Sequence, residues 1–395
     1  MCSTTPKTKA ASPAVKTPSG INKPPALPPI IGLQKFLTDQ YNAEQTKLEP
    51  ASTKIGTFTV GSKDAAISIR AIDTNGDNQI GEINGDKMHY SASMIKVACM
   101  YAAFNLRCAA RVHAKNNSFT NQNDFLSSFA NTIDTSSAIQ RLKDFGKGLK
   151  PDLPNIIGGF TGSGANEVNF LPVYKNDMIE MIVNSSDAQA GNCIRKLGYS
   201  YINVSLMTEH FFDPNTLNGI WLAGDYTGET VMKSVRVPVD NDTVPGGSGQ
   251  ATTAREMSRM FQLIHTQKTL SHIADTAERD AGNQGMHTLI QAAPWWYDNN
   301  TSTVHITEPL KFSRDCAKIG VGPLGKSGEG GPSVVSLGHV VTWDHESQTT
   351  NFNAKFKRAL TGDFAICWQN MYEPFSHFDS LMRIMNNSIE QFLTQ

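Results

Sequence analysis

The run Ser93-Met-Ile-Lys96-Val-Ala-Cys-Met-Tyr-Ala-Ala-Phe104 holds a single charged residue, Lys96, in an otherwise apolar setting. Apolar side chains around the whole circumference predict a helix that is buried on every side. Burying an unpaired ammonium costs several kcal/mol, or lowers the lysine pKa until the amine is neutral and competent as a general base. Ser93 lies three residues earlier on the same helical face, where the helix N-terminus offers free N–H groups and positive potential. The run therefore predicts a serine nucleophile activated by a lysine base.

Two more short motifs follow along the chain. Ser186-Asp187-Ala188 comes directly after an apolar segment, and Lys326-Ser327-Gly328-Glu329 contains the only K-[ST]-G of the sequence. Taken alone, the first is explained as a helix cap and the second as a strand end that enters a turn. Their order behind the buried Ser-x-x-Lys helix favours a shared active site instead.

This order of motifs resembles that of the penicillin-recognising serine hydrolases, the superfamily of class A β-lactamases and D-Ala-D-Ala peptidases. The resemblance covers residues 55 to 395 and is strongest on the class A side. It implies that Ser93 is the acylated nucleophile, Lys96 the base or proton relay, and Ser186 the group that passes the proton to the leaving nitrogen. Substrate-binding residues implied in the same way are Lys326, Ser327, Gly328 and Glu329, with the N–H groups of Ser93 and Glu329 as the oxyanion hole.

The Ser186 motif departs from the family pattern. The family has Ser-Asp-Asn, whereas Ala188 stands here in the third position. The amide that would contact both the substrate and the catalytic lysine is therefore missing, and we expect weaker positioning of the substrate. Asp187, Ala188 and Asn192 are expected to lie near the site as structural residues.

The family's deacylating acid is a second departure. No Glu-x-x-Leu-Asn follows Ser186, although Asp225 and Glu229 offer carboxylates in a different spacing. Each is a candidate deacylating acid, and each is also explained as a solvated loop residue. With such an acid the protein would turn over as a β-lactamase; without one, the acyl-enzyme would persist, as in a penicillin-binding peptidase or a covalent sensor.

We expect a serine hydrolase that opens a lactam, amide or ester through a Ser93 acyl-enzyme, with β-lactam hydrolysis, and hence antibiotic resistance, as the first expectation. The alternatives are a D-Ala-D-Ala carboxypeptidase or esterase of the same superfamily, or a non-hydrolytic β-lactam-binding sensor. The partner is a small molecule, either a β-lactam or a peptidoglycan-like acyl donor. The reaction requires no cofactor and no metal, because Lys96, Ser186 and backbone donors suffice for acyl transfer.

Composition excludes several other classes. The chain has 395 residues, 39% of them hydrophobic, and a formal net charge of -1. Such a balance offers no excess positive charge for nucleic acid, and no stretch approaches the roughly 18 apolar residues of a membrane span. Six scattered cysteines show neither a disulfide framework nor zinc-ligand spacing.

The segment Asp73-Thr-Asn-Gly-Asp-Asn-Gln-Ile80 begins like a calcium-binding loop, with oxygen ligands at alternate positions. Asn78 stands where such a loop needs glycine, and Asn84 where it needs a bidentate glutamate. We interpret the segment as a hairpin turn, which selects Asn, Asp and Gly for its own reasons.

Strand patterns at both ends of the chain, with helices between them, predict one discontinuous sheet. The expected fold is α/β and β-lactamase/transpeptidase-like, with an antiparallel sheet from both termini, flanking helices and an inserted all-helical lobe. The expected domain is 31–395, in which 31–90 and 301–395 form the α/β lobe and 91–300 the helical lobe. Residues 1–30, rich in Pro, Lys and Thr, are interpreted as a disordered tether.

Cys2 follows Met1 directly and precedes Ser, Thr, Pro and Lys, as in a trimmed bacterial lipoprotein that has gained an initiator Met. With the resemblance, this gives an expected periplasmic or secreted location with a lipid anchor on Cys2. A cytoplasmic protein with a disordered tail is the alternative.

Overall fold

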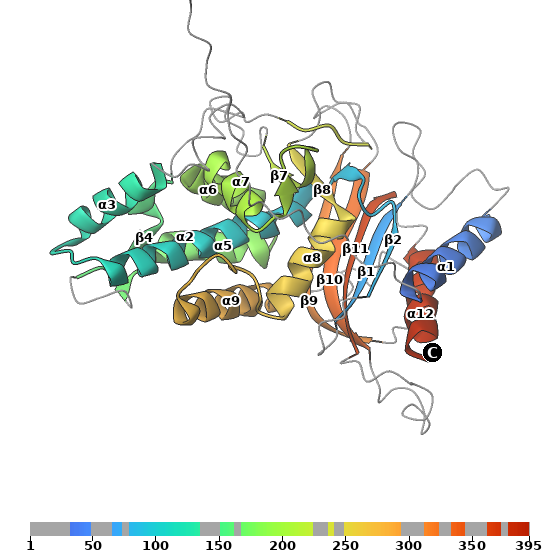
Figure 1. The fold of residues 1–395 in the computed structure, drawn as a ribbon. Coiled ribbons are helices and arrows are strands. Elements are labelled where there is room, and N and C mark those ends of the chain that lie inside the picture. The colour runs from blue at the N-terminus through green and yellow to red at the C-terminus, as the bar shows by residue number, and fades with distance from the viewer. Residues whose placement is uncertain are drawn as a thin grey trace, which may run out of the picture.

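The computed structural model of the chain (Figure 1) describes residues 32–48, 65–72, 79–134, 151–161, 167–223, 236–240, 249–293, 312–323, 333–343, 362–372 and 378–394. Its helices are α1 (Leu33–Leu48), α2 (Lys96–Asn116), α3 (Gln122–Asp134), α5 (Pro172–Ile182), α6 (Asp187–Leu197), α7 (Tyr199–Thr208), α8 (Ala254–His265), α9 (Thr276–Gln291) and α12 (Phe378–Thr394), with 3-10 turns η1 (Ala92–Ile95) and η2 (Leu153–Asn155). Its strands are β1 (Ala66–Ile72), β2 (Ile80–Ile83), β3 (Met88–Tyr90), β4 (Ile157–Gly158), β5 (Asn169–Phe170), β6 (Phe212–Asp213), β7 (Asn218–Leu222), β8 (Gln250–Thr253), β9 (Phe312–Pro323), β10 (Ser333–Trp343) and β11 (Asp363–Tyr372).

The main sheet joins the two ends of the chain, as the strand patterns predicted. Its order is β2-β1-β11-β10-β9, and every neighbouring pair is antiparallel. β1 pairs with β11 in a register that sets Ile67 opposite Trp368. The expected antiparallel α/β sheet is confirmed, and β9, from Phe312 to Pro323, forms one of its edges.

Alternation along the strands assigns one face of the sheet to the terminal helices and the other to α8. In β11, Phe364, Ile366 and Trp368 pack with α1 and α12, whereas Ala365 and Cys367 join the core on the opposite face. Figure 1 shows α1 beside α12 on one side of the sheet and α8 on the other. The sheet is therefore buried on both faces, and its β9 edge faces η1.

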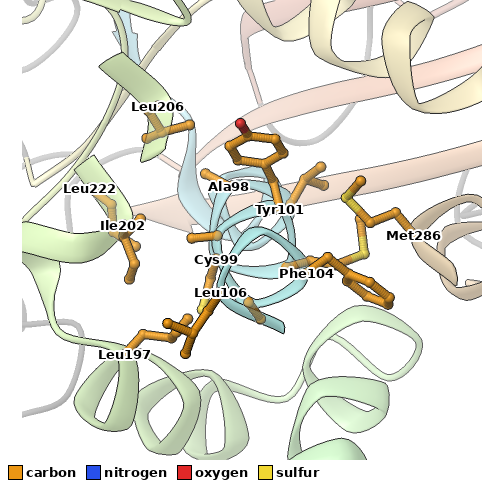
Figure 2. Packing of buried hydrophobic residues seen from close by; sticks show 14 of the residues in the cluster. Ala98, Cys99, Tyr101, Phe104, Leu106, Leu197, Ile202, Leu206, Leu222 and Met286 are labelled. Atoms are coloured by element: carbon orange, nitrogen blue, oxygen red, sulfur yellow. The ribbon is translucent and has the colours of Figure 1, made fainter. Parts of the chain in front are cut away.

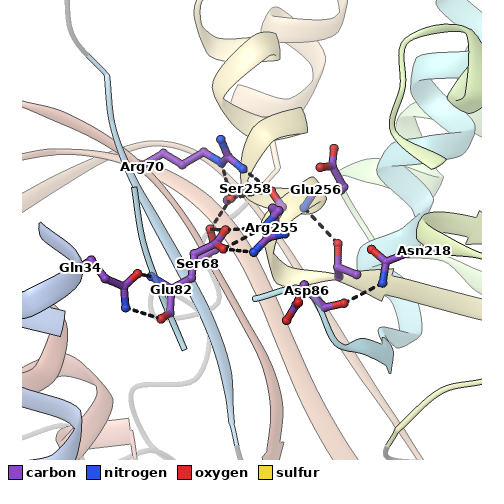
Figure 3. A network of polar contacts seen from close by, with 10 residues as sticks. Gln34, Ser68, Arg70, Glu82, Asp86, Asn218, Arg255, Glu256 and Ser258 are labelled. Carbon is purple, nitrogen blue, oxygen red and sulfur yellow. Dashed lines mark hydrogen bonds and ion pairs between the residues drawn. The ribbon is translucent and has the colours of Figure 1, made fainter. Parts of the chain in front are cut away.

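A polar network fastens α8 to the first strands (Figure 3). Arg70 Nε donates to Ser258 Oγ at 2.8 Å, and a second nitrogen of Arg70 donates to the Arg255 carbonyl at 3.0 Å. Arg255 in turn forms an ion pair with Glu82 of β2, with Nε 2.8 Å from Oε2. Burial lowers the pKa of Arg70 to about 10, against the opposing charge of Glu256. Because this buried guanidinium keeps its partners, the network orients α8 across β1 and β2.

Helix α2 runs through the centre of the inserted lobe. Every residue from Lys96 to Leu106 is buried, which confirms the helix that the apolar run predicted. Figure 2 shows Cys99, Tyr101 and Phe104 leaving this helix in different directions. The elements packed around α2 include α5, α6, α7 and α9.

The inserted region also contains short strands, so it is mostly rather than entirely helical. β6, β7 and β8 join β3, which lies just before this region, in a four-stranded sheet of order β3-β8-β7-β6, and β4 pairs with β5. These strands have two to five residues, too few to display a clear twofold period in the sequence. In the described ranges, no helix is both long and apolar enough to cross a bilayer. The tether at 1–30, with Cys2, and the turn at 73–78 lie outside the described residues.

Candidate active site

Ser93 lies in the tight turn that opens the central helix. From Ser91 to Leu106, it is the one residue that is not fully buried. Ala92, immediately before it, has a φ of +47°, a left-handed conformation that is strained for a residue with a side chain. Such strain costs about 1–3 kcal/mol and is concentrated at functional sites. The fold therefore presents the Ser93 hydroxyl at the surface of an otherwise closed core.

Lys96 has a side chain with no exposed surface, and its ammonium points to the loop before α6. Its Nζ donates to the carbonyl oxygen of Ser185 at 2.5 Å and to Asp187 Oδ1 at 2.6 Å. Burial lowers the pKa of Lys96, whereas the hydrogen bond and charge of Asp187 raise it, and the net direction is downward. A lysine held in this way is closer to its neutral form than one in water, as a general base requires.

Asp187 links the two predicted catalytic groups. The Ser93 hydroxyl lies 3.5 Å from Asp187 Oδ1, the same oxygen that Lys96 contacts at 2.6 Å. One carboxylate oxygen therefore lies between the hydroxyl and the amine. Asp187 was expected near the site only as a structural residue, whereas in the structure it is the shared contact of Ser93 and Lys96.

The hydroxyl next to Lys96 belongs to Ser185. Its Oγ lies 3.4 Å from Lys96 Nζ. With a φ of +54°, Ser185 is, like Ala92, a residue of this site in the left-handed conformation. The Ser186 hydroxyl, for which proton transfer was predicted, contacts Gln189 Oε1 at the start of α6. Ser186 stays a prediction in that role, and Ser185 has the geometry for it. Of the predicted structural residues, Ala188 is exposed and Asn192 lies more than one helical turn beyond Asp187.

A second buried lysine faces the site from the sheet. Lys318 of β9 is 4% exposed, and burial together with the charge of Lys96 lowers its pKa to about 7, with Asp187 acting in the opposite direction. Lys96, Lys318 and Asp187 together provide two amines and one carboxylate at this site. This donor set suits proton transfer and the binding of an anion better than it suits a metal ion.

Gly320 allows β9 to touch the turn that carries Ser93. A Cβ at this position would lie 2.3 Å from the carbonyl oxygen of Ser91 and 2.7 Å from the backbone nitrogen of Ser93. Both are backbone atoms, which cannot swing away. Glycine is therefore required for this close approach, and the approach sets Lys318, two residues earlier, beside Lys96.

Lys318-Ile319-Gly320 has the same Lys-x-Gly spacing as the predicted Lys326-Ser327-Gly328, eight residues earlier. It does not match the K-[ST]-G pattern, because Ile319 stands in the place of the hydroxyl residue. The available signal was a lysine inside the apolar strand Cys316-Ala-Lys-Ile319, an anomaly of the same kind as Lys96. Predicted residues outside the described part of the chain are Lys326, Ser327, Gly328, Glu329, Asp225 and Glu229.

No protein-family model matches the chain, and no curated protein matches it. Solved structures similar to it include a β-lactamase from Sphaerobacter thermophilus, at 13% identity and a TM-score of 0.42, with 89% of this chain and 95% of the other covered. A β-lactamase from Desulfarculus baarsii has 11% identity, a TM-score of 0.45, and coverage of 90% and 97%. The β-lactamase from Streptomyces albus G has 12% identity, a TM-score of 0.40, and coverage of 89% and 97%.

Proposed function

We propose that the protein is a serine hydrolase that opens an anionic acyl substrate through a Ser93 acyl-enzyme, with a β-lactam as the first candidate. The observation that carries this proposal is the convergence of Ser93 Oγ and Lys96 Nζ on one oxygen of Asp187, at 3.5 and 2.6 Å. A hydroxyl that reaches the surface, next to an amine with a lowered pKa, is the pairing that nucleophilic catalysis needs.

In the proposed reaction the Ser93 oxygen forms a bond to the substrate carbonyl carbon while its proton passes, by way of Asp187, to neutral Lys96. The bond from that carbon to the leaving nitrogen or oxygen then breaks. The proton moves from Lys96 to the leaving atom through the Ser185 hydroxyl, which lies 3.4 Å from the amine. Water later releases the acyl group and regenerates Ser93. The backbone N–H groups at the start of α2 support the negative charge on the carbonyl oxygen.

The buried Lys318 is the reason to propose that the substrate is anionic. Its ammonium is buried at the edge strand that touches the Ser93 turn. A substrate carboxylate would give it a partner, and a charge-assisted hydrogen bond of this kind is stronger than a neutral one. β-Lactams and peptides that end in a free carboxylate both satisfy this requirement.

The test is the intact mass of the protein over time with a penicillin, a cephalosporin and a carbapenem, while product is measured in parallel. Wild type and Ser93→Ala are compared, because the variant lacks only the attacking oxygen. An adduct that needs Ser93 and decays as product accumulates supports the hydrolase. Neither adduct nor product with any of the three contradicts the β-lactam proposal, and the same comparison with a dipeptide ester then tests esterase or peptidase activity.

A second candidate is a penicillin-binding peptidase or sensor that is acylated without rapid turnover. The sequence favours it, because no Glu-x-x-Leu-Asn follows Ser186 and the carboxylate that would activate the deacylating water is therefore not present in the family's spacing. A Ser93-dependent adduct that persists for hours would identify this candidate. The periplasmic or secreted location, with Cys2 as a lipid anchor, is a proposal supported by the motif resemblance and the N-terminal sequence.

A further inference from the structure

Apart from the Ser93 site, a second cluster of polar side chains comes from α8, α9 and β9. His265 ends α8, His287 lies on α9, and Asp315 lies near the start of β9. One ligand atom from each lies within 4.8 Å of the other two. His265 Nδ1 is 2.7 Å and His287 Nε2 is 2.9 Å from the same oxygen, Asp315 Oδ2. Two imidazole nitrogens, from α8 and α9, and one carboxylate oxygen, from β9, therefore lie close together.

The strand is deformed at the residue that supplies the carboxylate. Val340 pairs with Cys316 and Val341 with Arg314, so Asp315 is an extra residue of β9 with no partner on β10. A bulge of this kind redirects a side chain and is common next to functional sites. It turns the Asp315 carboxylate to the two histidines on α8 and α9.

The outer atoms of the same residues have partners of their own. His265 Nε2 lies 3.2 Å from Asp363 Oδ2, and Gln291 Nε2 donates to Asp315 Oδ1 at 2.6 Å. Thr342 in turn donates to Asp363 Oδ1 at 2.6 Å. A histidine whose second ring nitrogen meets a carboxylate, beside a carboxylate whose second oxygen is hydrogen-bonded, is the support that metal-binding residues usually have.

We propose that His265, His287 and Asp315 bind a divalent transition-metal ion, with Zn²⁺ as the first candidate. Ligands at about 2.0–2.2 Å from tetrahedral zinc lie roughly 3.3 Å apart. The two distances to Asp315 Oδ2, 2.7 and 2.9 Å, therefore need to open by about half an ångström, and the two imidazole nitrogens lie within 4.8 Å of each other. The three side chains are 13 to 17% exposed, which leaves room for water as the fourth ligand. Binding replaces the ring protons that point at Asp315 Oδ2, and these are released to solvent.

The ion would hold α8 and α9 against the β9 edge of the sheet. α9 packs on β9, and α8 packs on β10 and β11. A metal at this junction joins the inserted lobe to the sheet without touching the Ser93 site. Its presence is therefore separable from the proposed hydrolase, and a protein inactive on every acyl substrate would still bind the ion.

The experiment uses the full chain after removal of metal with a chelator. It is titrated with Co²⁺, whose visible spectrum reports coordination, and zinc per chain is measured by elemental mass spectrometry. His287→Gln and Asp315→Asn remove one ligand each, and His113→Gln changes a half-buried histidine of α2 as the matched control. Asp363→Asn tests the supporting carboxylate.

We expect one equivalent of metal in the wild type and in His113→Gln, with the absorption of four- or five-coordinate Co²⁺ and a rise in Tm on adding zinc. His287→Gln and Asp315→Asn lose all three signals, and Asp363→Asn weakens affinity about 10–100-fold. A wild type without stoichiometric metal or cobalt absorption overturns the proposal, and it does so whether or not the variants fold. Equal binding by wild type and His287→Gln overturns it as well, leaving a hydrogen-bonded ion-pair cluster.

Discussion

Lys96, whose side chain has no exposed surface, lies 2.6 Å from a carboxylate oxygen of Asp187, whose side chain is 81% exposed. The pair therefore crosses the boundary between the core and the solvent. A charge inside the core is connected to the surface by a single carboxylate, next to the one residue of the turn, Ser93, that is not buried. Through this relation the buried amine of Lys96 contacts a group that reaches solvent.

Replacing Asp187 tests what the carboxylate does for the lysine. Asp187→Ala leaves a buried ammonium without its charged partner, so we expect the free energy of unfolding to fall by roughly 1–2 kcal/mol. The expected loss is no larger because solvent screens the exposed aspartate and weakens the ion pair. Asp187→Asn keeps a hydrogen-bond acceptor and should lose less. Urea unfolding of the three proteins measures the difference. Equal stabilities would show that Ser185 alone satisfies the amine.

Replacing Lys96 separates catalysis from folding. Lys96→Met removes a buried charge while keeping an unbranched apolar chain, so we expect unfolding stability to stay the same or to rise. The rate of Ser93 acylation should fall about 10²–10⁴-fold, because the general base is lost. Stopped-flow acylation and urea unfolding are measured on the same preparation. A folded Lys96→Met protein with the wild-type acylation rate contradicts the assignment of the base.

The pH dependence of substrate capture should follow Lys318. Its pKa is lowered to about 7, so the ammonium is present below that pH and is lost above it. For an anionic substrate we expect kcat/KM to fall as pH rises through about 7, mainly through a higher KM. Lys318→Met should have a higher KM throughout and lack this fall. A neutral ester is the control substrate, and an identical fall with it would assign the titration to another group.

Gly320 and Gly338 form a matched pair of substitutions. Gly320→Ala drives a methyl group into the backbone of Ser91 and Ser93, so we expect about a 10²-fold loss of acylation rate from the displaced nucleophile. Gly338→Ala instead meets the Phe261 ring of α8, at 2.3 Å from its nearest atom. It should lower Tm with little change in the acylation rate of the folded protein. If both variants lose only stability, close approach at Gly320 does not position Ser93.

The sequence by itself determined the parts of the fold that depend on local periodicity. The burial of nine consecutive residues, from Lys96 to Phe104, was predictable because a helix that is apolar around its whole circumference has no polar face to turn to solvent. The strand patterns at both ends of the chain, which correspond to β1, β10 and β11, were predictable for a similar reason, since they depend on residues close together in the sequence. Ser93 and Lys96 followed from one anomalous charge in that pattern.

Only the tertiary structure decided which residues meet Lys96. Ser185 rather than its neighbour Ser186 reaches the amine, because a left-handed residue in the loop sets which hydroxyl turns inward. Lys318 comes beside it because a glycine lets β9 approach the Ser93 turn, and Asp315 meets two histidines because a bulge shifts the register of the same strand. Such contacts join residues far apart in the chain, and they depend on strand register and backbone approach, which hydrophobic periodicity does not encode.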